Sequence, residues 1–89
     1  MRIPSYTTQF KKDLKRVKKR GKNTEKLKSI MSQLIDEEAL AARHRDHVLV
    51  GNYRGRRECH VEPDWLLIYK LDGLQIIFER TGSHADLFS

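Results

Sequence analysis

A short apolar run, Trp65-Leu66-Leu67-Ile68-Tyr69, most constrains the fold of this 89-residue chain. Apolar and polar residues do not alternate in it, which is typical of a strand buried on both faces in the middle of a sheet. Such a strand, which we extend to Leu71, needs a neighbour on each side. Turn residues flank it, namely Glu62-Pro63-Asp64 before and Asp72-Gly73 after. They predict antiparallel neighbours.

The two neighbouring strands are predicted from Tyr53 to Val61 and from Leu74 to Arg80. Side chains alternate between the two faces of a strand. In the first of these strands one face therefore carries four charged or titratable residues, Arg54, Arg56, Glu58 and His60. Cys59 and Val61 point to the opposite face.

The N-terminal half predicts an edge strand and two helices. Pro4, which has no N–H to donate, places the segment from Arg2 to Tyr6 at a sheet edge. The first helix is predicted from Thr8 to Arg20, and the second from Asn23 or Thr24 to between Asp36 and Glu38. Both have apolar residues at helical spacing on one stripe, and together they predict an antiparallel hairpin of helices.

The remaining segments predict little regular structure. Residues 38–51 are expected to form a loop with one helical turn, and residues 84–88 a short C-terminal turn. The chain is thus predicted to be a single α+β domain over residues 1–89, with the order β-α-α-β-β-β. The helices should cover one face of a small antiparallel sheet, and the other face should be partly open.

Positive charge is concentrated at the N-terminus. The net charge is +6, but residues 1–22 hold nine Lys or Arg against the single acid Asp13. This local patch predicts a polyanionic partner, for which we favour nucleic acid over an anionic membrane or an acidic protein. The residues expected to contact RNA are Lys11, Lys12, Lys15, Arg16, Lys18, Lys19, Arg54, Arg56 and Trp65. For Trp65, packing in the core is an equal alternative to stacking on a base.

Three features concern the cellular compartment. The single cysteine, Cys59, excludes an internal disulfide and fits a reducing cytosol. No apolar run follows the N-terminus as in a signal peptide, and none is long enough to span a bilayer. We expect a cytoplasmic protein with no membrane partner.

Four histidines lie near this predicted hairpin or just after the last strand. Cleavage of RNA through its own 2′-hydroxyl needs a base, an acid and a cation that stabilises the phosphorane. Residues that supply all three are His47, His60, Asp64, Arg80 and His84. The alternatives are scattered surface histidines or a metal site. His44 and His47 have the spacing of half a zinc site, but the adjacent Cys59 and His60 face opposite sides of a strand and suit chelation poorly.

Four segments carry a family resemblance. They are the run from Arg57 to Tyr69, the Asp46-His47 pair followed by Leu49 and Gly51, the run from Phe78 to His84, and the C-terminal Ala85-Asp86-Leu87-Phe88. In this order they resemble the YafQ branch of the RelE/ParE toxin superfamily, over essentially the whole chain. The resemblance implies the RelE-like fold.

The resemblance also implies a function. Such toxins belong to type II toxin–antitoxin pairs and are mRNA endonucleases that cut in the ribosomal A site without a metal or other cofactor. The implied catalytic residues are His47, His60, Asp64, Arg80, His84 and Phe88. His84 would be the acid, and His47 or His60, helped by Asp64, the base. Arg80 would hold the scissile phosphate and Phe88 would orient the RNA.

The resemblance implies partners and leaves alternatives open. The partners are a cognate antitoxin, the ribosome and mRNA, with DNA contacted only through the antitoxin complex. The alternatives are a ribosome-independent RNase, a non-catalytic nucleic-acid-binding module, and a gyrase-targeting relative on the same fold.

Overall fold

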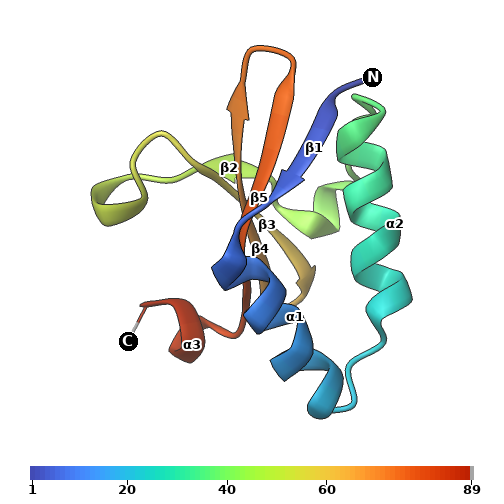
Figure 1. Ribbon diagram of the computed structural model, residues 1–89, viewed down its shortest axis with the longest axis vertical. Helices are drawn as coiled ribbons and strands as arrows, with labels where there is room; N and C mark the ends of the chain where they lie inside the picture. Colours follow the sequence, from blue (N-terminus) through green and yellow to red (C-terminus); the bar gives the residue numbers. More distant parts are fainter. Residues whose placement is uncertain (89) are drawn as a thin grey trace.

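The sheet and helices are ordered along the chain much as the sequence predicts (Figure 1). The computed structural model describes residues 1–88, with five strands in the sheet order β1-β5-β4-β3-β2. The elements are β1 Ile3–Tyr6, α1 Thr8–Lys19, α2 Thr24–Ile35, β2 His47–Val48, β3 Arg57–Glu62, β4 Trp65–Asp72, β5 Gln75–Gly82 and α3 His84–Phe88, with short 3₁₀ turns at Ala42–His44 and Gly51–Tyr53.

β4 lies in the centre of the sheet, which confirms the prediction from its apolar run. It pairs antiparallel with β3 and with β5, and Trp65 to Tyr69 are all buried. Trp65, Leu67 and Tyr69 join the larger core, which α1 and α2 cover with residues such as Phe10 and Leu27. The opposite face holds a smaller cluster of Leu66, Ile68 and Leu87. Helices thus cover one face, and the other is only partly covered.

The helices begin and end where their capping residues predict. Thr7 accepts a hydrogen bond from the backbone N–H of Phe10 at 2.9 Å, and Asn23 caps α2 in the same way. Gly21, at φ +81°, follows α1 and adopts the left-handed conformation typical of helix C-termini. In Figure 1 the two helices run in opposite directions on one side of the sheet, as the predicted hairpin requires.

The segment before β3 differs from the prediction. β3 begins at Arg57 rather than at Tyr53, because residues 51–53 form a 3₁₀ turn and both Gly51 and Gly55 have positive φ. Arg54 therefore lies in a loop and not on the strand. The sequence also missed β2, a two-residue edge strand that pairs antiparallel with the start of β3. Strands this short carry no readable periodicity.

The first strand is at the edge of the sheet, as Pro4 predicts. β1 pairs with β5 alone, in parallel, so its other side remains free of strand partners within residues 1–88. In the same part of the chain, no helix combines the length and apolar character needed to span a membrane.

Trp65 is a core residue, and its burial contradicts the prediction that it contacts RNA. Its exposed fraction is 1%, so neither ring face is available to a base. Its indole N–H donates to the hydroxyl of Thr81 at 2.9 Å, and that hydroxyl donates to the carbonyl of Leu66 at 2.7 Å. This buried chain of hydrogen bonds ties β4 to β5 on the helix-covered side.

Replacing Thr81 with Val should lower the free energy of unfolding by about 2–3 kcal/mol, because it leaves the indole N–H and the Leu66 carbonyl buried without partners. Urea unfolding at neutral pH measures this. Thr8→Val is the control, since Thr8 is exposed at the start of α1. Equal stability of the two variants would contradict the role assigned to Thr81.

Candidate active site

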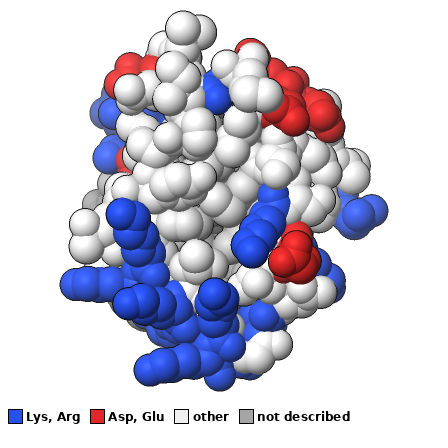
Figure 2. Space-filling model, turned by 45° about the vertical axis from the view of Figure 1, so that its right-hand side comes forward, with Lys and Arg blue, Asp and Glu red and all other residues white. Residues whose placement is uncertain are grey.

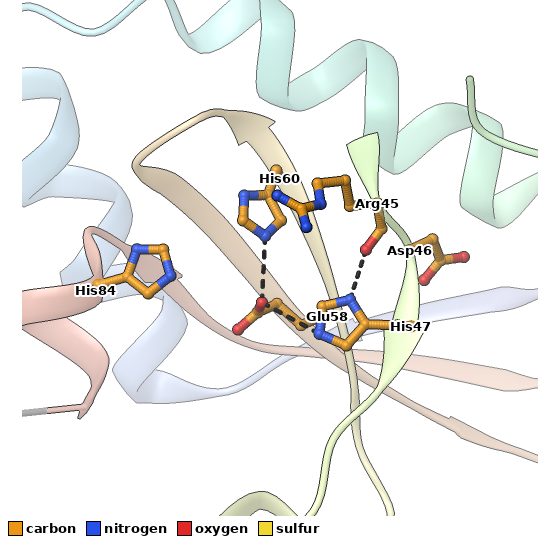
Figure 3. A pocket seen from close by; sticks show the side chains of 6 residues that line it. All are labelled: Arg45, Asp46, His47, Glu58, His60 and His84. Atoms are coloured by element: carbon orange, nitrogen blue, oxygen red, sulfur yellow. Dashed lines mark hydrogen bonds and ion pairs between the residues drawn. The ribbon is translucent and has the colours of Figure 1, made fainter. Parts of the chain in front are cut away.

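A hollow of about 640 Å³ opens on the sheet face opposite α1 and α2 and gathers titratable residues from three segments (Figure 3). Arg45, Asp46 and His47 come from β2 and the residues before it, Glu58 and His60 from β3, and His84 from α3. Its size is in the range of small-molecule and nucleotide sites. We call it the histidine cleft.

Sheet register brings the cleft residues together. His47 on β2 pairs with Glu58 on β3, and His60 lies two residues further along the same face. Cys59, between them, is fully buried in the core, and that burial raises the pKa of its thiol to about 12. The predicted alternation along this strand is therefore confirmed for Glu58 and His60.

Glu58 is the buried carboxylate of the cleft, and the sequence reading did not select it as a site residue. Its side chain is 6% exposed, and Oε1 lies 3.5 Å from Nε2 of His47 and 3.4 Å from Nε2 of His60. The signal was present, because Glu58 and His60 share a strand face at i, i+2. What the sequence did not reveal is that both imidazoles would converge on the same oxygen.

The other ring nitrogens define how His47 and His60 are oriented. Nδ1 of His47 contacts the carbonyl of Arg45, and Nδ1 of His60 contacts the carbonyl of Pro63 at 3.3 Å. A carbonyl only accepts, so each Nδ1 must carry the hydrogen. In both rings Nε2 is then the nitrogen available to take or release a proton.

Asp64 is paired with His84, which corrects the expectation that it assists His47 or His60. Oδ1 of Asp64 accepts from the backbone N–H of His84 at 3.0 Å and from Nδ1 of the same residue at 2.8 Å. The backbone N–H and then the ring of His84 hold the pKa of Asp64 below its usual value. The turn after β3 thus fixes the first residue of α3, and Nε2 of His84 has no hydrogen-bond partner among residues 1–88.

The three cleft imidazoles lie close enough to act on one substrate. Ring centroids are 6.4 Å apart for His47 and His60, and 5.9 Å apart for His60 and His84. Phe88 continues the row, 6.2 Å from the ring of His84, and stands edge-on to Tyr53 at 5.3 Å. It is 46% exposed, so its ring remains accessible to a base. His44 is outside this row, because its Nδ1 bonds the His60 carbonyl at 2.7 Å and it does not line the cleft.

Arg80 lies on the same sheet face but outside the cleft lining. In the sheet, Arg80 lies opposite Ile68, and Ile68 lies opposite Glu58. The backbones of Arg80 and Glu58 are therefore two strand spacings apart, roughly 10 Å in all. Its Nε donates to Asp13 at 2.7 Å and its Nη2 to the same carboxylate at 3.3 Å. Donating these hydrogen bonds to Asp13 raises the pKa of Arg80.

Asp13 is the fully buried partner of this arginine and a second residue that the sequence reading did not select. It also accepts from Arg16 at 2.9 Å and from the backbone N–H of Thr81 at 3.1 Å. Its only signal in the sequence was its position as the sole acid among the first 22 residues.

The cations predicted to contact RNA divide into free and paired groups. Five lysines of α1 are exposed without an ion pair in the part of the chain that the structure describes, namely Lys11, Lys12, Lys15, Lys18 and Lys19. Figure 2 shows Lys and Arg side chains gathered at the lower end of the molecule, where α1 and the loop to α2 lie in Figure 1. Arg54 is also exposed, but Arg16 and Arg56 are paired with Asp13 and Glu79.

Asp86 attaches α3, and with it His84 and Phe88, to α1. It accepts two hydrogen bonds from Arg20, at 2.6 and 3.0 Å, and one from the backbone N–H of Ser83 at 2.9 Å. The carboxylate packs over Gly82, where an added Cβ would lie 2.8 Å from Oδ2. The hydrogen bond from Arg20 is the main reason that the pKa of Asp86 lies well below its usual value.

Replacing Asp86 with Asn should lower stability by about 1 kcal/mol at neutral pH, since Arg20 is half exposed and water screens the pair. A carboxyl with a lowered folded pKa stabilises the fold above its usual pKa of 3.8, and this contribution is lost as pH falls through the folded value. The difference from the unmodified protein should therefore shrink below pH 3.8. Urea unfolding across this range tests it, with Asp72→Asn as the exposed control; a difference independent of pH would contradict the pairing.

Comparison with known proteins places the chain among bacterial toxins. Residues 2–89 match the family model described as bacterial toxin of type II toxin–antitoxin system, YafQ. The curated mRNA interferase toxin YafQ of Escherichia coli K12 is 50% identical over 84 residues, which cover 93% of this chain and 91% of that protein.

Two solved structures have closely similar folds. YafQ in the crystal structure of the E. coli DinJ–YafQ complex is 48% identical, with a TM-score of 0.93 and full coverage of both chains. A metal-bound toxin from Helicobacter pylori is 36% identical, with a TM-score of 0.92 over 99% of this chain and 100% of that one. On the strength of the family match over nearly its full length, the chain belongs to the YafQ family of bacterial type II toxin–antitoxin toxins.

Proposed function

We propose that this toxin is an endoribonuclease that cuts mRNA by acid–base catalysis, using the RNA 2′-hydroxyl as nucleophile. The observation that carries the proposal is the convergence of His47, His60 and His84 on one open cleft above the buried Glu58. The similar E. coli toxin is named an mRNA interferase, which agrees with this chemistry.

The base in this mechanism is His47 or His60. Both direct Nε2 at the Glu58 carboxylate of the cleft while a carbonyl fixes Nδ1. Taking a proton from the 2′-hydroxyl creates an imidazolium beside the Glu58 carboxylate, and the low dielectric around a buried carboxylate strengthens that attraction. Glu58 thus assists the base, a role that the sequence analysis assigned to Asp64.

The acid is His84. Asp64 accepts a hydrogen bond from its Nδ1, so Nε2 is the nitrogen that exchanges a proton with the substrate. Its Nε2–H is then free to protonate the 5′-oxygen as that oxygen leaves. The acid and the base thus have separate carboxylate partners, Asp64 and Glu58.

RNA is held by cations around the cleft and on α1. Arg80 stands on the same sheet face and stabilises the charge that develops on the phosphorane. The exposed lysines of α1 attract the phosphate backbone over a longer range, and this part of the affinity should weaken with salt. Ribosomal RNA around an A-site message is the partner that we assign to them, so the protein would act in the cytoplasm.

A cognate antitoxin is the second partner. The E. coli relative was solved in complex with DinJ, and a toxin of this kind must be held inactive until needed. We propose that an antitoxin segment covers the histidine cleft or the lysines of α1.

We propose that the reaction needs no metal. The acid, the base and the cations are all side chains of this chain. Within residues 1–88, no three His, Cys, Asp or Glu side chains are arranged to hold a metal ion. The toxin from H. pylori was solved with a metal bound, so the point needs a direct experiment.

Mapping 5′ ends of a defined mRNA, with and without programmed ribosomes, tests the nuclease. We expect cuts in register with the A-site codon when ribosomes are present. His84→Ala should reduce the rate by about 10²–10⁴-fold because it removes the acid. The control is His44→Asn, which keeps a donor for the His60 carbonyl.

Each outcome of this mapping is decisive. Cuts on naked RNA as well would make the cleft a self-sufficient nuclease and contradict ribosome dependence. No cuts from folded protein in either lane would overturn the proposal in favour of a binding module or a gyrase-targeting toxin. Equal rates for His84→Ala and the unmodified protein would overturn the assignment of the acid.

Adding EDTA should leave the cleavage rate within about twofold of the untreated rate, because proton transfer by imidazole needs no Lewis acid. The cleavage rate is measured on a single mRNA fragment. If cleavage requires ribosomes, which need Mg²⁺, a chelator selective for transition metals replaces EDTA and free Mg²⁺ is kept in excess. Loss of activity that zinc or copper restores would contradict metal independence.

A further inference from the structure

We infer that Arg45 binds an RNA phosphate inside the histidine cleft, a role that neither the sequence reading nor the family resemblance assigns to it. The inference rests on the proposed function, since it names a further substrate-contacting residue of the same site. Arg45 is the only Lys or Arg among the described residues that line the cleft.

Position is the first argument. Arg45 lines the cleft together with His47 and His60, and it also lines the adjoining hollow with His60. Figure 3 shows its side chain on the His60 side of the cleft, away from His84. When the 2′-oxygen of a ribose faces His60, the phosphate on the 3′-oxygen of that ribose would therefore lie within the space that this guanidinium borders.

Charge is the second argument. The cleft holds the carboxylate of Glu58, and that of Asp64 stands beside His84. An anionic backbone enters such a site only if a cation offsets these carboxylates. Arg45 is exposed and has no carboxylate partner in residues 1–88. Five other arginines are, by contrast, paired with carboxylates, namely Arg16, Arg20, Arg56, Arg57 and Arg80.

Backbone conformation is the third argument. Arg45 has φ +49° and ψ +47°, a left-handed conformation that costs energy for any residue with a Cβ. Its carbonyl is also the acceptor for Nδ1 of His47. A strained residue that both orients the base and directs a free guanidinium at the cleft is the kind that function maintains.

Arg45 and Arg80 would hold RNA from opposite sides. Arg80 is two strands from Glu58 in the direction of α1, and two of its nitrogens are occupied by Asp13. Arg45 lies on the β2 side, and its guanidinium has no side-chain partner within the described residues. The phosphate beside the base would then contact Arg45, and Arg80 would act nearer the leaving group.

The left-handed backbone supplies an unusually clean test. Arg45→Gly removes the side chain and relieves the strain, because Gly adopts this conformation freely. The variant should therefore melt no lower than the unmodified protein. Arg43→Ala is the matched control, since Arg43 is an exposed arginine two residues earlier without an ion pair in residues 1–88, and it lines the adjoining hollow but not the cleft. Arg45→Lys restores charge without the planar fork.

The first readout is binding of a non-cleavable RNA oligonucleotide carrying a 2′-deoxy substitution, measured against salt. Arg45→Gly should weaken binding at least roughly tenfold and reduce the slope of log affinity against log salt by about 0.7, as expected for one lost phosphate contact. Arg43→Ala should change neither, and Arg45→Lys should recover part of both. Unchanged binding by folded Arg45→Gly would overturn the inference.

The second readout is the cleavage rate in the mapping reaction. Arg45→Gly should cut about 10²-fold more slowly than Arg43→Ala. If the unmodified protein cuts RNA and the two variants cut at equal rates, the role of Arg45 is overturned while the nuclease proposal stands. Absence of cutting by the unmodified protein would instead overturn the proposed function, and the binding comparison would still decide whether Arg45 contacts RNA.

Discussion

The alternation of side chains along β3 is the constraint on which the site depends. Cys59 and Val61 are buried against the helices, so the register of the strand cannot slip by one residue without exposing them. The same register places Glu58 and His60 on the opposite face, and pairing with β2 adds His47 above Glu58. Burial on one face thus fixes the geometry of the histidine cleft on the other.

Carboxylates connect the parts of this basic protein. Asp13 joins α1 to β5 through Arg80 and Thr81, and Asp86 joins α3 to α1 through Arg20. Asp64 then fixes His84 from the turn after β3. Asp13 and Asp86 each offset two neighbouring arginines, so cations that would repel one another inside the fold are held together. Among residues 1–88, the cations without an ion pair include the exposed lysines of α1 and a few arginines, Arg45 among them.

This division of charge separates stability from binding. Paired arginines stabilise the fold and release their carboxylates only at a cost, because a buried partner such as Asp13 would lose its hydrogen bonds. Arg80 would therefore contact RNA through a donor that Asp13 does not occupy. Exposed lysines cost the fold little and contribute attraction that is sensitive to salt. Arg45 is different from both groups, since it is unpaired and yet lies in the cleft.

Sequence alone determined the elements whose signals are local. The apolar run of β4, the capping residues Thr7 and Asn23 and the turn at Asp72-Gly73 each depend on neighbours a few residues away. They predicted the order of strands and helices, and the resemblance of short motifs predicted the family. The tertiary structure decided contacts between residues remote in the chain. Asp64 and His84 are 20 residues apart, and Asp13 and Arg80 are 67 apart.

Those remote contacts are why the assignment of partners changed. Periodicity shows which face of a strand a residue occupies, but it does not show which residue from another element will meet it. Trp65 was therefore consistent with either a base-stacking or a core position until β5 brought Thr81 to its indole N–H. The left-handed backbone of Arg45 likewise follows from the path between α2 and β2, a segment without any local pattern in the sequence.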